Sequence, residues 1–293
     1  MQLLLFWLVY PALLLISILP FRLLFALSDG VYFLVYRIAG YRKKTVRRNL
    51  KMAFPNLSDK ERKAIEIKFY HHLCDMFLEM IKTMSMSHAE MEKHFRFTNP
   101  ELFLEMQAKG KSIMMYASHY GTYEWIISVN YHTDNPGFAV YKRIRNVHFD
   151  KLVRKIRSRF KAHLITTKET VPTIIHNRAA GISTVYGLVS DQSPKASSIQ
   201  HWTTFMGIET PVHIGAELLA KRYDMIAMNL RVESVKRGYY ECTYEVLAEN
   251  PRDVPNFQIS EDFMNRLEKQ IRKAPELYLW THKRWKHRRE NFK

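Results

Sequence analysis

A histidine and a glutamate, His119 and Glu124, are the residues whose types and spacing best suit catalysis. They lie in the segment SIMMYASHYGTYEW, where a strand-like apolar run leads through Gly121 into a helix-like run. An imidazole becomes a general base when a carboxylate bonds its other ring nitrogen and fixes the tautomer. Because five residues along one helix separate two side chains by about 140°, Glu124 can reach the imidazole only if His119 precedes the helix. Taken alone, such a pair is more often two unrelated surface side chains.

The segments that must position this pair alternate between two patterns. Short β-rich runs occupy 112–117, 137–141, 164–166, 182–189, 225–232 and 239–247. Helix-like runs lie between several of them, at 121–129, 150–160, 171–177 and 214–222. This alternation predicts an α/β fold with a mostly parallel sheet flanked by helices, in which the last two strands can pair antiparallel. Since ligands of such sheets bind at the carboxyl ends of the strands, His119 is expected at a binding edge.

Two longer helices are expected to frame this core. Ser58 and Glu61 form a capping-box pattern, which predicts a helix that runs to about Met84. Ser260 is the expected N-cap of a final helix, which must end before Pro275 because proline cannot continue it.

The N-terminal residues are strongly apolar. An uncharged run covers 3–19, and a second run, 23–36, resumes after Arg22. No Lys or Arg precedes the first run and no small-residue cleavage site follows it, which favours a retained membrane anchor over a removable signal peptide. The first run is marginal against the ~20 residues of a spanning helix, so a tilted span, a re-entrant hairpin and a helix lying in the interface all stay open. We expect an anchor over 1–40 and one further domain over 41–293.

The chain is basic, with 45 Lys and Arg against 28 Asp and Glu and a formal net charge of +17 over 293 residues. Such a surplus predicts an anionic partner, whether nucleic acid, acidic lipid or acidic protein. The sequence contains no helix-turn-helix, RNP, KH or zinc-finger pattern, which argues against nucleic acid. The basic cluster from Arg37 to Arg48 follows the apolar runs, and by the positive-inside rule it places the body of the protein on the cytoplasmic side. A second basic run, from Lys142 to Lys161, contains Asp150 as its only acid.

Metal and disulfide chemistry are not expected. Cys74 and Cys242 are the only cysteines, too few for a disulfide framework or a four-ligand zinc site. The histidines show no metal-ligand spacing, so we expect neither a metal nor a cofactor.

Several segments, in consistent order along the chain, carry a resemblance to a known family. His119 and Glu124 match the His-x4-Asp/Glu signature of glycerolipid acyltransferases. Further stretches resemble the branch of lipid A lauroyl and myristoyl acyltransferases: RRNLKMAFP at 47–55, YKRIRN at 141–146, IRSRF at 156–160, DQSP at 191–194 and LWTHKRWK at 279–286. The chain departs from the family where Arg143 replaces a usual Pro and Lys161 replaces a frequent Gly, which bears on the roles of the arginines and on the acceptor.

The resemblance implies a glycerolipid acyltransferase-like fold at the cytoplasmic face of the inner membrane. It also implies transfer of a fatty acyl chain from acyl-acyl carrier protein to a hydroxyl of an anionic lipid A precursor. His119 would be the general base and Glu124 its orienting carboxylate. Arg157 and Arg159 are the preferred anion-binding pair, because they match the family's central block and arginine fits phosphate and carboxylate bidentately. The other expected substrate-binding residues are Tyr141, Arg143, Asp191 and Gln192.

Alternatives stay open at this stage. The same chemistry could act on a lysophospholipid or an aminolipid, and a non-catalytic, membrane-tethered protein that binds anionic ligands would also be basic. The 142–161 run is also compatible with a solvated helix face, and the DQSP segment with an ordinary turn. Trp280 and Trp285, with the basic residues between them, are the expected second contact with a membrane surface.

Overall fold

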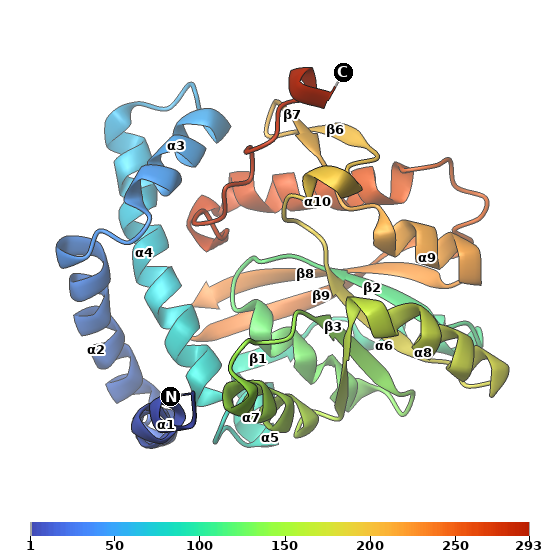
Figure 1. The fold of residues 1–293 in the computed structure, drawn as a ribbon, viewed down its shortest axis with the longest axis horizontal. Helices are drawn as coiled ribbons and strands as arrows, with labels where there is room; N and C mark the ends of the chain where they lie inside the picture. Colours follow the sequence, from blue (N-terminus) through green and yellow to red (C-terminus); the bar gives the residue numbers. More distant parts are fainter. Residues whose placement is uncertain (1, 293) are drawn as a thin grey trace.

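Seven strands form the central sheet of the computed structural model, which describes residues 2–292 (Figure 1). In spatial order they are β1 (Phe95–Phe97), β9 (Tyr239–Ala248), β8 (Ile226–Lys236), β2 (Ile113–Ala117), β5 (Val185–Val189), β3 (Gly137–Tyr141) and β4 (Ala162–Thr166). Neighbouring strands run parallel except β8 and β9, which are antiparallel. The predicted α/β fold with a mostly parallel sheet is therefore confirmed.

Helices cover both faces of this sheet, with α9 and α10 above it and α5 and α7 below it in Figure 1. The α-helices are α1 (Gln2–Ile18), α2 (Phe21–Tyr32), α3 (Lys43–Ala53), α4 (Asp59–Lys82), α5 (His88–His94), α6 (Pro100–Ala108), α7 (Val147–Ser158), α8 (Thr167–Ala179), α9 (Gly215–Tyr223) and α10 (Gln258–Lys273). A π-helical segment (Phe33–Ile38) extends α2, and 3₁₀ segments are η2 (Tyr123–His132), η3 (Ala196–Ser198), η4 (Pro275–Leu277) and η5 (Arg289–Phe292). The sequence patterns did not reveal β1, α5, α6 or the small hairpin of β6 (Trp202–Phe205) and β7 (Ile208–Pro211).

Strand β2 shows why the central strands read as unbroken apolar runs. Successive strand residues point to opposite faces, and Met114 and Tyr116 belong to the core beneath α9 and α10. Ile113 and Met115 belong to the core on the other face, with Phe103 of α6. Since helices cover both faces, all five residues of β2 are buried.

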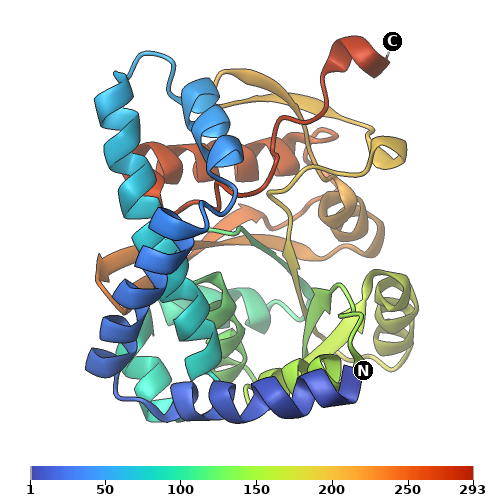
Figure 2. The ribbon, with the colours of Figure 1, turned by 60° about the vertical axis from the view of Figure 1, so that its left-hand side comes forward.

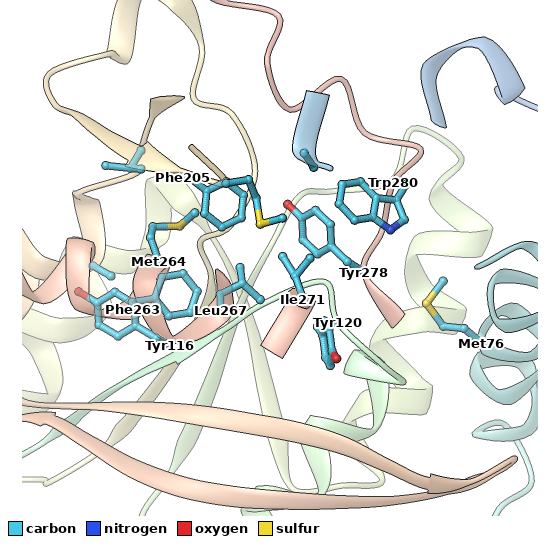
Figure 3. Packing of buried hydrophobic residues seen from close by; sticks show 14 of the residues in the cluster. Met76, Tyr116, Tyr120, Phe205, Phe263, Met264, Leu267, Ile271, Tyr278 and Trp280 are labelled. Atoms are coloured by element: carbon cyan, nitrogen blue, oxygen red, sulfur yellow. The ribbon is translucent and has the colours of Figure 1, made fainter. Parts of the chain in front are cut away.

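Helix α10 supplies much of the upper core. Figure 3 shows Phe263, Leu267 and Ile271, which are spaced by one helical turn, on the side that faces Tyr116 and Tyr278. The rings of Phe263 and Tyr116 lie 5.3 Å apart between centroids. This layer of the core connects the sheet to the C-terminal segment.

The two predicted helix starts have different outcomes. The capping box before α4 is confirmed, because the Ser58 hydroxyl accepts from the Glu61 amide and the Glu61 carboxylate accepts from the Ser58 amide. The prediction that Ser260 caps the last helix is wrong. Phe257 is the N-cap, and the Ser260 hydroxyl instead donates to the buried Glu217 carboxylate across the interface with α9.

The N-terminal helices pack along α4. Leu24 and Tyr36 are buried, and the Lys82 ammonium donates to the carbonyl of Leu19, between α1 and α2, at 3.0 Å. The opposite side of these helices exposes large apolar side chains: Leu3, Leu4, Leu5, Trp7, Leu8, Leu14, Leu15, Ile18, Leu23, Leu27, Phe33, Leu34 and Ile38. Figure 2 shows α1 lying across one end of α4, with α3 at the other end.

The length of these helices bears on the expected anchor. Within residues 2–292, no single helix is both long enough and apolar enough to cross a membrane. The segments Phe21–Ile38 and Lys43–Ala53 reach the required length and composition only together, and they are bent by 88° relative to each other.

Candidate active site

His119 lies in the tight connection between β2 and η2, at the carboxyl end of the strand. Gly121 has a φ of +61°, and a Cβ added there would lie 3.0 Å from a side-chain carbon of Val232. Glycine is therefore required both by the left-handed backbone and by the close approach. The C-terminal segment holds this connection, because the Leu279 amide donates to the His119 carbonyl at 3.1 Å and the Gly121 amide donates to the Leu277 carbonyl at 2.9 Å.

The carboxylate that bonds the His119 ring belongs to Asp191. Its Oδ1 lies 2.7 Å from Nδ1 of the ring and also accepts the backbone amide of His119 at 3.0 Å. Asp191 follows β5, which pairs in parallel with β2, so the two residues leave adjacent strand ends at the same edge of the sheet. The expectation that Glu124 orients the imidazole is therefore corrected, since Asp191 occupies that position.

The charges around His119 and Asp191 determine which ring nitrogen of His119 carries the proton. Burial alone would lower the pKa of His119, but the charge and hydrogen bond of Asp191, together with the charge of Glu124, raise it above its usual value. Burial would raise the pKa of Asp191, but His119 and the Arg284 guanidinium hold it low. Asp191 thus stays ionised and accepts the Nδ1 proton, which leaves Nε2 of the neutral ring as the basic nitrogen. The side-chain nitrogen of Gln192 lies 3.3 Å from this Nε2.

Glu124 forms an ion pair with Arg157 of α7. One terminal nitrogen of Arg157 lies 2.9 Å and 2.7 Å from the two carboxylate oxygens. Both side chains are largely shielded, at 16% and 22% exposure. The ion pair thus fixes η2 against α7 beside the imidazole.

A cavity of about 380 Å³ opens beside His119. Its rim carries the polar side chains of His119, Glu124, Tyr141, Lys142 and Arg157. The remaining lining residues come from the sheet and η2 and are apolar apart from Tyr123 and Asn130; the apolar ones include Met115, Ala117, Ile126, Ile127, Val129, Phe138, Ala139, Val140, Val185, Leu188, Val189 and Leu230. The arrangement can hold an apolar chain with its reactive end at the imidazole.

Arg159 does not point into this cavity. Its guanidinium donates to the backbone carbonyls of Thr83 and Met86 at 3.1 Å and 3.0 Å, and also to that of Met84. These carbonyls follow the end of α4, where a helix leaves such groups without partners. The expected role of Arg159 in binding substrate is corrected to a contact that holds the C-terminal end of α4.

Of the other predicted substrate-binding residues, one lines the cavity and two lie outside its lining. Tyr141 lines the cavity, and its hydroxyl donates to Asp150 at 3.2 Å. Arg143 is exposed in the connection that follows β3 and is not part of the cavity lining. Gln192 contacts the imidazole but lies outside the cavity lining.

The place of Tyr123 at the site and the packing of the C-terminal segment were not expected from the sequence. Tyr123, whose ring meets that of His119 edge-on at 4.8 Å, lines the cavity, and Lys142, the first residue of the basic run, lies on the rim. Trp280 and Trp285 are only 1% and 6% exposed, so the expected membrane patch there is wrong. The segment instead packs behind the site, where the buried Arg284 guanidinium donates to a backbone carbonyl at 3.0 Å.

Fold and site together define an α/β protein in which a histidine–aspartate pair borders an apolar cavity with cations at its rim. The chain belongs to the bacterial lipid A biosynthesis acyltransferase family, whose model matches residues 1–287. It is also 25% identical, over 287 residues, to the lipid A biosynthesis lauroyltransferase of Escherichia coli (strain K12), a match that covers 97% of this chain and 92% of that protein.

Proposed function

We propose that this enzyme transfers a fatty acyl chain from acyl-acyl carrier protein to a hydroxyl group of a lipid A precursor at the cytoplasmic face of the inner membrane. The observation that carries the proposal is the position of His119, whose Nδ1 bonds Asp191 and whose ring borders an apolar cavity. Acyl transfer to a hydroxyl group requires a base that removes the hydroxyl proton and a pocket that holds the acyl chain. This site offers both.

The proposed reaction is a direct transfer without an acyl-enzyme. Nε2 of His119 takes the proton from the acceptor hydroxyl as its oxygen attacks the thioester carbonyl carbon, and Asp191 stabilises the resulting imidazolium. The tetrahedral intermediate then collapses: the carbon–sulfur bond breaks, the thiolate takes the proton from the imidazolium, and an ester and a free thiol remain. Cys74 and Cys242, which are buried, have no part in these steps.

Glu124 and Arg157 have a second role in this proposal. Their ion pair lies at the rim, next to the imidazole, and Arg157 keeps donors that the carboxylate does not use. These donors suit an anionic group of the acceptor. The side-chain amide of Gln192, which lies at Nε2, is placed to donate to the oxyanion of the intermediate, a contribution of ~3 kcal/mol for a well-aligned donor.

The apolar cavity is the proposed site of the acyl chain. Its interior is lined by aliphatic and aromatic residues of β2, β3, β5 and η2, and burying an acyl chain there contributes about 0.8 kcal/mol for each methylene removed from water. The similar Escherichia coli protein is named a lauroyltransferase, so a lauroyl donor is the first to test.

The N-terminal helices are the proposed membrane contact. Their exposed apolar side chains lie on one side of α1 and α2, while the other side packs on α4. A helix of this kind lies in the interface with its apolar face in the acyl region. This attachment would bring a lipid acceptor to the cavity rim.

The test is a transfer assay with the purified full-length protein. Lauroyl-acyl carrier protein and a phosphorylated lipid A precursor are incubated with the enzyme, and the ester product is measured by mass spectrometry. We expect transfer with the unaltered protein and a loss of ~100-fold or more in His119→Ala at an unchanged melting temperature. Near-normal turnover in His119→Ala would contradict the mechanism. Transfer to a lysophospholipid or an aminolipid alone would show that the acceptor is not a lipid A precursor. Binding of anionic lipid without any transfer would show that the protein is not catalytic.

A further inference from the structure

A second basic surface lies beside His119, apart from the cavity rim. It consists of Lys44 and Arg48 of α3, Lys195 in the connection after β5, and Lys283 and Lys286 of the C-terminal segment, and is called the α3/C-terminal surface below. All five side chains are exposed. Among residues 2–292, none of the five forms an ion pair with a carboxylate.

The parts of this surface are held together by hydrogen bonds. The side-chain amide of Asn49 donates to the carbonyls of Trp280 and His282 at 2.8 Å and 2.7 Å. Arg42 donates to the carbonyl of Thr281 at 3.0 Å. Figures 1 and 2 both show α3 beside the C-terminal segment. The cations therefore belong to one rigid face.

The same face borders the imidazole. The C-terminal segment donates to the His119 carbonyl through Leu279. The Ser193 amide, two residues after Asp191, donates to the His282 ring at 3.2 Å. Docking on this face would place a flexible thioester arm within reach of His119.

The composition of the face favours a protein partner over a bilayer. The segments 42–53, 192–201 and 278–289 contain no Asp or Glu, and none of their large apolar side chains is exposed. A surface that enters a bilayer exposes large apolar side chains, as α1 does. Charge without apolar side chains suits the rim of an interface with an acidic protein.

We propose that the α3/C-terminal surface docks the acidic carrier protein that delivers the acyl thioester. The proposal rests on the proposed function, and it assigns the two substrates to different sides of the molecule. The carrier protein approaches from the α3 side, and the lipid acceptor approaches from the rim near Lys142 and Arg157, where α7 lies against α1.

The experiment compares two donors with the same acyl chain, one on acyl carrier protein and one on pantetheine without the protein. The test variant is Arg48→Glu/Lys283→Glu. The matched control is Lys168→Glu/Arg222→Glu, which makes the same change of charge at exposed cations of α8 and α9, on the far side from α3 in Figure 1. We expect KM for the carrier-protein donor to rise about tenfold in the test variant, because rim charges steer and orient an oppositely charged partner. KM for acyl-pantetheine and kcat should stay unchanged, and the control should match the unaltered enzyme with both donors.

Three outcomes would overturn the inference. The first is an unchanged KM for the carrier-protein donor in the test variant, and the second is an equal loss with both donors. The third is lost binding to phosphatidylglycerol vesicles at an unchanged KM for the carrier-protein donor, which would assign the surface to lipid. In each case transfer by the unaltered enzyme still stands. Absence of transfer from any donor in the unaltered enzyme would instead remove the proposed function, and this inference with it.

Discussion

At His119 two opposing effects act on one imidazole. Burial disfavours the protonated ring, while the Asp191 carboxylate and the nearby Glu124 charge favour it, and their influence prevails. A base in this environment accepts a proton readily and still has a neutral resting form at higher pH. The pair of residues can thus be tested through the pH dependence of the reaction.

The first prediction concerns Asp191→Asn. Loss of the carboxylate leaves burial to dominate, so the pKa of His119 falls. Because the neutral ring is the base, the acidic limb of the kcat/KM profile should move to lower pH, while the plateau falls by ~100-fold because the imidazolium loses its partner. Glu124→Gln should move the limb in the same direction by less. A limb that does not move in Asp191→Asn would show that another group titrates there.

The second prediction concerns Gly187 of β5, which lines the cavity. A Cβ added there would meet only the Phe138 carbonyl oxygen, at 3.9 Å, so a larger side chain fits the backbone and fills cavity space. Gly187→Val should shift the preference towards shorter acyl donors by about tenfold, since a missing or extra methylene in such a pocket changes discrimination by ~1–3 kcal/mol. Competition between donors of two chain lengths measures the shift. Gly215→Val, with open space around the new Cβ and no part in the cavity lining, is the control, and a shift of the same size there would contradict the assignment of the cavity.

The sequence identified His119 but not its partner, for a physical reason. Glu124 was the nearest carboxylate along the chain, whereas Asp191 becomes a neighbour only because β2 pairs with β5. The pattern of apolar residues does not reveal the order of strands in the sheet. A contact between two loops at the sheet edge therefore cannot be predicted from it. The ion pair of Glu124 with Arg157 could not be predicted for the same reason, because it joins η2 to α7.

Among the elements, those with strong local signals were predictable and those fixed by tertiary contacts were not. The Ser58–Glu61 capping box marks the start of α4 by itself. The segment after Gly121 was expected to be helical, but it forms the 3₁₀ segment η2, beside the cavity. Ser260 has the right residue type for an N-cap, but its hydroxyl bonds Glu217 of another helix. At Ser260 a tertiary partner overrides local propensity.

The third prediction tests the connection between α7 and α4. Arg159→Ala removes the donors to the carbonyls that follow α4, so the free energy of unfolding should fall by about 1–2 kcal/mol, a value reduced because the side chain is partly solvated. The KM values for both substrates should stay unchanged. Arg157→Ala should do the reverse, with a raised KM for the acceptor and an unchanged melt. Thermal melts beside steady-state kinetics separate the two, and a raised KM at unchanged stability in Arg159→Ala would return that residue to the site.

At the scale of the whole molecule, charge and apolar surface are segregated. The exposed apolar side chains concentrate on α1, α2 and the π-helical segment, while cations occupy the cavity rim and the α3/C-terminal surface. The sequence predicted an apolar N-terminus followed by basic residues. In the structure α1 and α3 lie at opposite ends of α4 (Figure 2), and the π-helical segment, which exposes Phe33, Leu34 and Ile38, leads into α3.

The last prediction tests the membrane contact without unfolding the protein. Deletion of the N-terminal helices would also remove the buried Leu24 and Tyr36, so substitutions on the exposed side are preferable. Leu4, Leu8 and Leu15 of α1 are 75%, 76% and 64% exposed. Their joint replacement by Gln should move the protein from the membrane fraction to the supernatant, because burial of each leucine in lipid contributes roughly 1.5–3 kcal/mol.

The control for this experiment replaces an equal number of exposed apolar residues on other elements, Leu104, Leu218 and Val235, by Gln. Flotation with phosphatidylglycerol-containing vesicles measures binding, and a thermal melt checks that both triple variants stay folded. We expect the control to float with the vesicles and the α1 variant to stay behind, while its turnover with a detergent-dispersed acceptor is kept because α1 supplies no residue to the cavity lining. If the α1 variant floats as well as the control does, the membrane contact must come from α2, the π-helical segment or a charged surface, and the proposed approach of the acceptor along α1 would be wrong.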